Sequence, residues 1–174
     1  KPATKPAFAG LGSAVVKPPP GYDPSDPDAA RKVNEAAQKA KELGAKIVIV
    51  HGETTVEPVE RGTNEAALDS AYVDVLAHPG LLTEAEAKTA AARGIFLEIS
   101  GRRGHSLTNG HVAKLGTHNN ALLLVNSDAH EPSDLLTQKR AHDIGLGAGL
   151  EQGQIPQILE SNPQALLRRL AAKN

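Results

Sequence analysis

The apolar residues of this chain fall into two kinds of pattern, short continuous runs and longer stretches with helical spacing. Four of the runs are almost wholly aliphatic, which is typical of strands buried on both faces of a parallel sheet. They are Lys46–Val50, Tyr72–Ala77, Ile95–Ile99 and Ala121–Val125. A shorter apolar run, Leu11–Val16, predicts one further strand before them.

The segments around these runs have polar faces and helix-capping residues. One helix is predicted to start at Asp26 and Pro27 and to end at Gly44. A second is predicted to start at Thr83, which forms a capping box with Glu86, and to end near Gly94. The other predicted helices are Asn64–Ser70, Thr108–Leu115, Ser133–His142 and Pro163–Ala172, with an extra turn or two in Gln154–Glu160 and a short apolar stretch at Ile144–Leu146.

This alternation of helix and strand predicts an α/β chain with a parallel sheet and right-handed crossovers. No internal repeat or linker interrupts it. We therefore expect a single domain over residues 1–174, with an irregular segment at 1–25.

Composition narrows the chemistry available to the chain. There is no cysteine, so a metal site would have to use His, Asp or Glu, which favours zinc, manganese or iron. Nineteen basic and 20 acidic side chains give a net charge of −1, which argues against a nucleic-acid partner. Without an apolar run of membrane-spanning length or a secretion signal, we expect no membrane association and a cytoplasmic location.

Metal-binding side chains follow three of the predicted strands directly. They are His51, His78, Asp128 and His130. The carboxyl ends of parallel strands meet on one face of an α/β barrel, so these side chains should lie near one another. A single histidine at a strand end is more often a hydrogen-bonded structural residue, but three strands sharing the feature favour a divalent-metal site.

The segments VDVLAHPG, LEISGRRGHSLTNGH and LLLVNSDAH resemble the later motifs of the PHP (polymerase and histidinol phosphatase) superfamily. HGETTVEPVERGTN resembles an earlier segment of its stand-alone histidinol-phosphatase-like members. The resemblance runs from about residue 40 to 136. It implies a distorted seven-stranded (β/α) barrel of the PHP type, up to three divalent ions, and phosphoester hydrolysis. His51, His78, Asp128 and His130 match metal ligands of the family.

The chain also departs from the family pattern. The opening His-x-His and Thr-Asp-His motifs are absent, and Gly12 or Ser13 stands where a glutamate is expected. The resemblance therefore predicts a barrel incomplete at its N-terminal side. Exposed sheet edges in such a barrel would favour pairing with a second copy of the chain.

Other polar residues lie near the predicted strand ends. Arg102 and Arg103 suit bidentate phosphate contacts, although solvated loop arginines are as plausible an interpretation. His105 and His111, in the same loop, would contact substrate or cap local backbone. Glu98 is either the partner of a ligand histidine or a buried hydrogen-bonded acid, and Glu53 is a further candidate ligand.

Taken together, these features predict a metal-dependent phosphatase that hydrolyses small phosphate monoesters similar to histidinol phosphate. Its catalytic residues would be His78, Asp128 and His130, with Arg102, Arg103 and His105 binding the phosphate. The alternative is a PHP-fold remnant that lost catalysis and serves as a binding or scaffold module, including a role like that of the ribonuclease P protein subunit.

Overall fold

The structure, a computed structural model, describes residues 13–16 and 28–172. Its strands form one parallel sheet in which the order in space follows the order in the chain, β1-β2-β3-β4-β5. The strands are β1 (Ser13–Val16), β2 (Ile47–His51), β3 (Val75–Ala77), β4 (Phe96–Ser100) and β5 (Leu123–Asn126). A strand order that never reverses is compatible with a barrel-like α/β fold, whereas a doubly wound sheet reverses its order.

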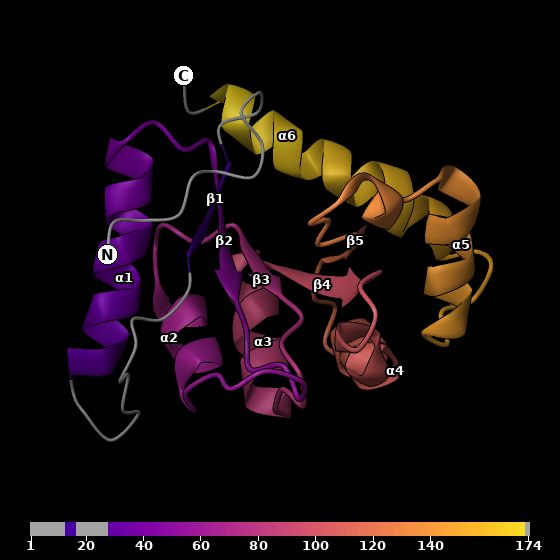
Figure 1. Cartoon of the computed structure of the whole chain (residues 1–174), viewed down its shortest axis with the longest axis horizontal. Helices are drawn as coiled ribbons and strands as arrows, with labels where there is room; N and C mark the ends of the chain where they lie inside the picture. The colour runs from indigo at the N-terminus through magenta and orange to yellow at the C-terminus, as the bar shows by residue number, and fades with distance from the viewer. Residues whose placement is uncertain (1–12, 17–27, 173–174) are drawn as a thin grey trace.

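Helices connect successive strands, as Figure 1 shows. They are α1 (Asp28–Glu42), α2 (Thr63–Asp69), α3 (Glu84–Arg93), α4 (Asn109–His118), α5 (Gln138–Gly147) and α6 (Asn162–Ala172). Three short turns of helix lie at η1 (His105–Thr108), η2 (Pro132–Asp134) and the π-helical η3 (Gln157–Ser161). In the described part of the chain, no helix is long and apolar enough to cross a membrane.

The two faces of the sheet have separate apolar cores. Alternate side chains of the strands, such as Val48, Leu76 and Leu97, pack against α1 to α4 in the larger core. Phe96 and Leu124 point to the other face and pack against Leu166 of α6. Burial on both faces explains why the strand sequences are continuously apolar.

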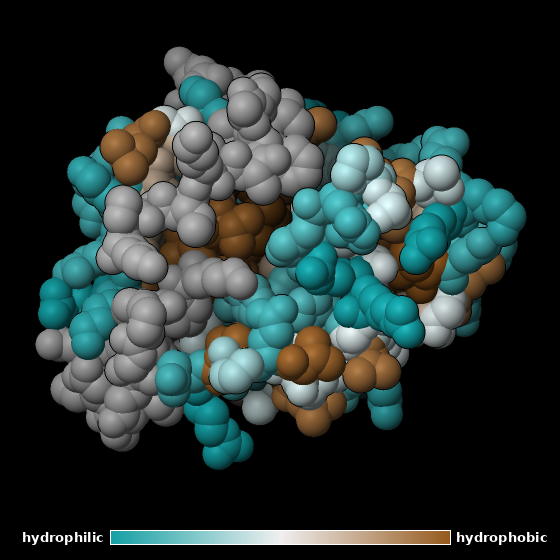
Figure 2. Space-filling view, in the orientation of Figure 1, coloured by the Kyte–Doolittle hydropathy of each residue, from teal (hydrophilic) through white to brown (hydrophobic). Residues whose placement is uncertain are grey.

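The second face is less fully covered at β1 and β2. Val15 is 53% exposed, and Ile47 and Ile49 are only partly buried. Figure 2 shows hydrophobic residues at the floor of a central hollow on the side of the molecule facing the viewer. Within the described sheet β1 and β5 are the edge strands, so pairing of two copies through an edge stays a prediction.

Most predicted elements are confirmed within a few residues. The start of the first helix at Asp26 and Pro27, and most of the segment 1–25, lie outside the described residues. The capping box of Thr83 and Glu86 is present, and Gly44 and Gly94 take left-handed conformations after α1 and α3.

Two predicted boundaries were wrong. The strand predicted from Tyr72 begins only at Val75, although the Asp74 backbone already donates to the Val48 carbonyl and accepts from the Phe96 N–H. The Asp74 carboxylate accepts hydrogen bonds from Lys41 Nζ (2.5 Å) and from the Val48 backbone N–H (2.9 Å). The helix predicted at 133–142 is split into η2 and α5, because the Thr137 hydroxyl caps a new helix start by accepting from the Arg140 N–H. The apolar stretch 144–146 belongs to α5.

Candidate metal centre

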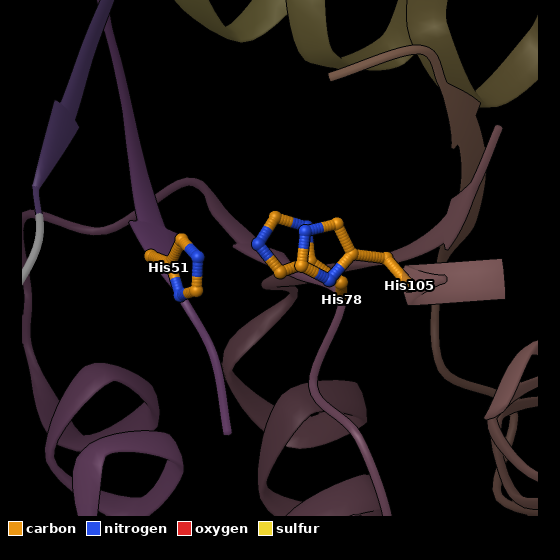
Figure 3. A group of neighbouring side chains, drawn as sticks. All are labelled: His51, His78 and His105. Atoms are coloured by element: carbon orange, nitrogen blue, oxygen red, sulfur yellow. The ribbon is translucent and has the colours of Figure 1, made fainter. Parts of the chain in front are cut away.

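Three histidines converge at the carboxyl ends of β2, β3 and β4 (Figure 3). His51 is the last residue of β2, and the alternation of side chains along the strand turns it to the same face as Ile47 and Ile49. His78 follows the last residue of β3, and His105 opens η1, five residues after β4. The parallel register of the strands therefore brings together residues 27 positions apart in the sequence.

One ring nitrogen from each histidine lies within 4.8 Å of the others. The His78 ring centroid is 4.3 Å from that of His51 and 4.1 Å from that of His105, with the His78 and His105 rings stacked. All three side chains are buried. Imidazole nitrogens converging at this spacing match the ligand set of a divalent transition metal such as zinc.

His78 is held as a metal ligand would be. Its Nδ1 lies 3.2 Å from Oε1 of the fully buried Glu98, whose other oxygen accepts a hydrogen bond from Asn126 Nδ2. Its Nε2 is the one buried side-chain polar atom without a partner among the described residues. A buried unpaired nitrogen is costly, and a carboxylate behind the opposite ring nitrogen is the usual support of a metal-bound histidine. The residues therefore fit a metal ion.

Glu57 faces the other two rings. Its carboxylate oxygens lie 3.3 Å from His51 Nε2 and 3.4 Å from His105 Nε2. The opposite nitrogen of His51 lies 3.1 Å from the Gly52 carbonyl, which fixes the proton on Nδ1 when the ring is neutral. The Nε2 lone pair of neutral His51 then faces a carboxylate oxygen, as two ligands of one cation would. Glu57 is accordingly a candidate fourth ligand.

The protonation state of His105 suits ligation. Burial lowers the pKa of His105, and the neighbouring His78 lowers it further, while Glu57 and Asp128 act in the opposite direction and Arg102 adds to the lowering. Its Nδ1 is held by the Thr54 hydroxyl at 2.6 Å. A ring that stays neutral keeps a lone pair for a metal without first having to release a proton.

Because the folded-state pKa of His105 lies below its unfolded value, metal-free protein should lose stability in acid. The contribution is complete above about pH 6.5, the ordinary histidine pKa, and is lost as the pH falls towards the lower folded pKa. Urea unfolding of chelator-treated protein measures this. As the pH falls across this range, the free energy of unfolding should decrease more for the parent than for His105→Asn, which retains a donor for Thr54. Identical pH profiles would contradict this.

The structure places the other predicted ligands outside the histidine cluster. Asp128 Oδ2 is 3.8 Å from His105 Nε2 but 3.4 Å from Arg102 Nε. The His130 ring, with a side chain 58% exposed, lies 2.6 Å from Arg102 Nη1. Asp128 has a φ of 48°, so the extended backbone that would align the two side chains is not present. Whether either binds a metal stays a prediction.

The remaining candidates divide between a pocket and structural contacts. Arg102 and Arg103 line an open pocket of about 410 Å³ beside His130, Glu131 and Asp134. The Glu53 carboxylate accepts the Asn64 backbone N–H at the start of α2, and its role as a ligand stays a prediction.

Two other histidines have structural partners in the fold. His111 Nε2 lies 2.7 Å from the Leu82 carbonyl. His142 Nε2 lies 2.9 Å from Gln152 Nε2.

Backbone strain coincides with the site. Among the residues whose placement is described, the non-glycine positions with positive φ are His78, Asn120 and Asp128. His78 directly follows β3, and Asp128 lies two residues after the end of β5. Left-handed conformations of bulky residues cost free energy and gather at functional sites.

No family model matches the chain. It is 45% identical over 140 residues to the uncharacterized protein MJ1295 of Methanocaldococcus jannaschii. The alignment covers 80% of this chain and 64% of that protein, so the chain spans less than two thirds of the relative's length. The relative's name states no activity, and the similarity therefore assigns none.

Proposed function

We propose that the chain is a metal-dependent phosphoesterase built on part of a PHP-type barrel, acting on small phosphate monoesters. The observation that carries the proposal is the buried His51–His78–His105 cluster, with the unpartnered His78 Nε2 at its centre. A three-histidine site with an oxygen ligand is a common arrangement in hydrolytic metal enzymes. The motif resemblance points in the same direction.

A divalent ion at this site would act as a Lewis acid towards a phosphoryl oxygen, and it would lower the pKa of a bound water so that hydroxide is available as the nucleophile. The chain's own residues provide the setting. Glu98 fixes the orientation of His78, and the buried walls keep bulk solvent away from the rings. Arg103 is exposed at the pocket that it lines with Arg102 and His130, which supports a role in binding the phosphate anion.

The test is hydrolysis by protein that has been stripped with chelator and reloaded. We expect release of phosphate from p-nitrophenyl phosphate and histidinol phosphate with manganese or zinc, and none with chelator present. Preparation without metal-affinity resin avoids carried-over ions. His142→Ala is the matched control, because this histidine is half-buried in α5, outside the histidine cluster, and pairs with Gln152. Activity that persists without metal would contradict the proposal.

A second function is favoured by the position of Asp128 and His130. Both contact Arg102, and neither is one of the three residues of the histidine cluster. A protein that binds metal but hydrolyses no phosphate ester would be a binding or scaffold module that retains the fold. Metal content measured alongside the hydrolysis assay separates these two functions.

A further inference from the structure

Arg102 lies among acceptors that resemble the ligands of a metal ion. Its Nη1 donates to the Asp128 backbone carbonyl at 3.0 Å and lies 2.6 Å from His130 Nδ1. The same guanidinium is 3.4 Å from the Asp128 carboxylate and 3.6 Å from that of Asp134. Two carboxylates, a carbonyl and an imidazole therefore surround one positive charge.

The His130 ring is turned towards the same guanidinium. A guanidinium has only donors, so a hydrogen bond between the two side chains uses the lone pair of His130 Nδ1, 2.6 Å from Arg102 Nη1. The same nitrogen lies 2.8 Å from the Asp128 carbonyl oxygen, to which Arg102 also donates. The imidazole and the carbonyl therefore direct acceptor atoms at one cation, as ligands of a metal ion do.

The surrounding loop is shaped around this group. Asp134 Oδ2 accepts the backbone N–H groups of His130 and Glu131 at 2.9 and 3.2 Å, which fixes the carboxylate towards Arg102. Asp128 lies between the two sites, with the same Oδ2 near both Arg102 and His105. The cation beside Asp128 is therefore the Arg102 guanidinium, a side chain of the protein itself.

We infer that Arg102 takes the place of a second metal ion, so that Asp128, His130 and Asp134 form a cation site closed by the protein's own guanidinium. The inference rests on the proposed function in one respect, because the first ion is the one proposed for the histidine cluster. The arginine cannot be deprotonated in a protein, so it holds Asp128 in place at any physiological pH. Removing its charge should open the site to a divalent ion of the kind that accepts mixed oxygen and nitrogen ligands.

Metal content of the full chain tests the inference. Chelator-stripped parent, Arg102→Ala and Arg102→Gln are titrated with zinc, and bound zinc is counted by elemental analysis after desalting and by calorimetry. We expect each variant to bind one ion per chain more than the parent. The gain should disappear in Arg102→Ala/His130→Ala. Arg103→Ala, which removes a neighbouring arginine of the same loop, should leave the count unchanged.

The glutamine variant retains side-chain length and a donor, so it keeps the test valid if the alanine variant folds poorly. A parent and Arg102→Gln with equal zinc content would overturn the inference, as would a gain that survives loss of His130. A parent that binds no zinc would instead contradict the histidine-cluster proposal, and the gain on removing Arg102 would still be measured.

Discussion

Replacing His78 with alanine should abolish tight metal binding and, with it, metal-dependent hydrolysis. His78 is the central ring of the cluster, since its centroid lies 4.3 Å from that of His51 and 4.1 Å from that of His105. Its Nε2 has no partner among the described residues. Loss of a residue that merely supports a ligand typically weakens metal binding about 10- to 100-fold. Loss of the ligand itself should therefore weaken zinc affinity by at least about 100-fold.

Thermal unfolding gives a readout that is independent of activity. A ligand at about 100 times its Kd stabilises the folded state by about 2.7 kcal/mol, so zinc should raise the Tm of the parent by several degrees. The same zinc concentration should leave the Tm of His78→Ala nearly unchanged. His142→Ala should respond as the parent does, because that side chain lies on α5 and pairs with Gln152.

Glu98→Gln refines the same experiment. Its amide oxygen can still accept from His78 Nδ1, while its NH2 group requires the Asn126 amide to turn and present its oxygen. The charge that makes the His78 ring more basic is lost. We expect a zinc affinity between those of the parent and His78→Ala. An unchanged zinc response in His78→Ala would place the metal elsewhere, and the histidine assignment would then be wrong.

The strands and the strand-end histidines were predictable because their signals are local. A continuous aliphatic run predicts a buried strand, and side-chain alternation turns His51 to the face of Ile47 and Ile49. Parallel strands then bring His78 to the same end of the sheet. The positions of His51 and His78 in the site thus follow from side-chain alternation and from the ends of the predicted strands.

The rest of the site depends on features that have no local signal. The left-handed conformation of Asp128 separates its side chain from that of His130, and nothing in Ser127-Asp128-Ala129 encodes it. Glu57 reaches two histidines from a loop without periodicity. Placement of His105 in the cluster needs the turn after β4, in which Gly104 has a positive φ of 92°.

The sequence also did not predict that α6 covers the second face of the sheet. Helix α6 has an amphipathic pattern, but the pattern does not say which face of the sheet its apolar side meets. Leu166 packs against Phe96 and Leu124, and the Arg169 guanidinium lies 4.9 Å from the centroid of the Phe96 ring. These are long-range contacts, which decide tertiary structure without leaving a mark on local propensity.

The loops after β2 and β3 contact each other through their backbones, and two glycines make this contact possible. A Cβ on Gly52 would lie 2.6 Å from the Ala77 carbonyl oxygen, and a Cβ on Gly80 would overlap the Glu53 carbonyl group. Gly80 also has a φ of 65°. This close approach brings the rings of His51 and His78 together, so the metal cluster depends on residues that carry no ligand.

Gly80→Ala should therefore cost stability and metal affinity together. The left-handed conformation alone costs about 1–2 kcal/mol for a residue with a Cβ, and overpacking against fixed backbone adds about 1–3 kcal/mol. Gly149→Ala is the matched control, since Gly149 has a φ of 86° but nothing within 4 Å of an added Cβ. Urea unfolding should show the larger loss for Gly80→Ala, and only this variant should bind zinc more weakly. Equal losses in the two variants, with zinc binding intact in both, would mean that the β2 and β3 loops do not set the geometry of the cluster.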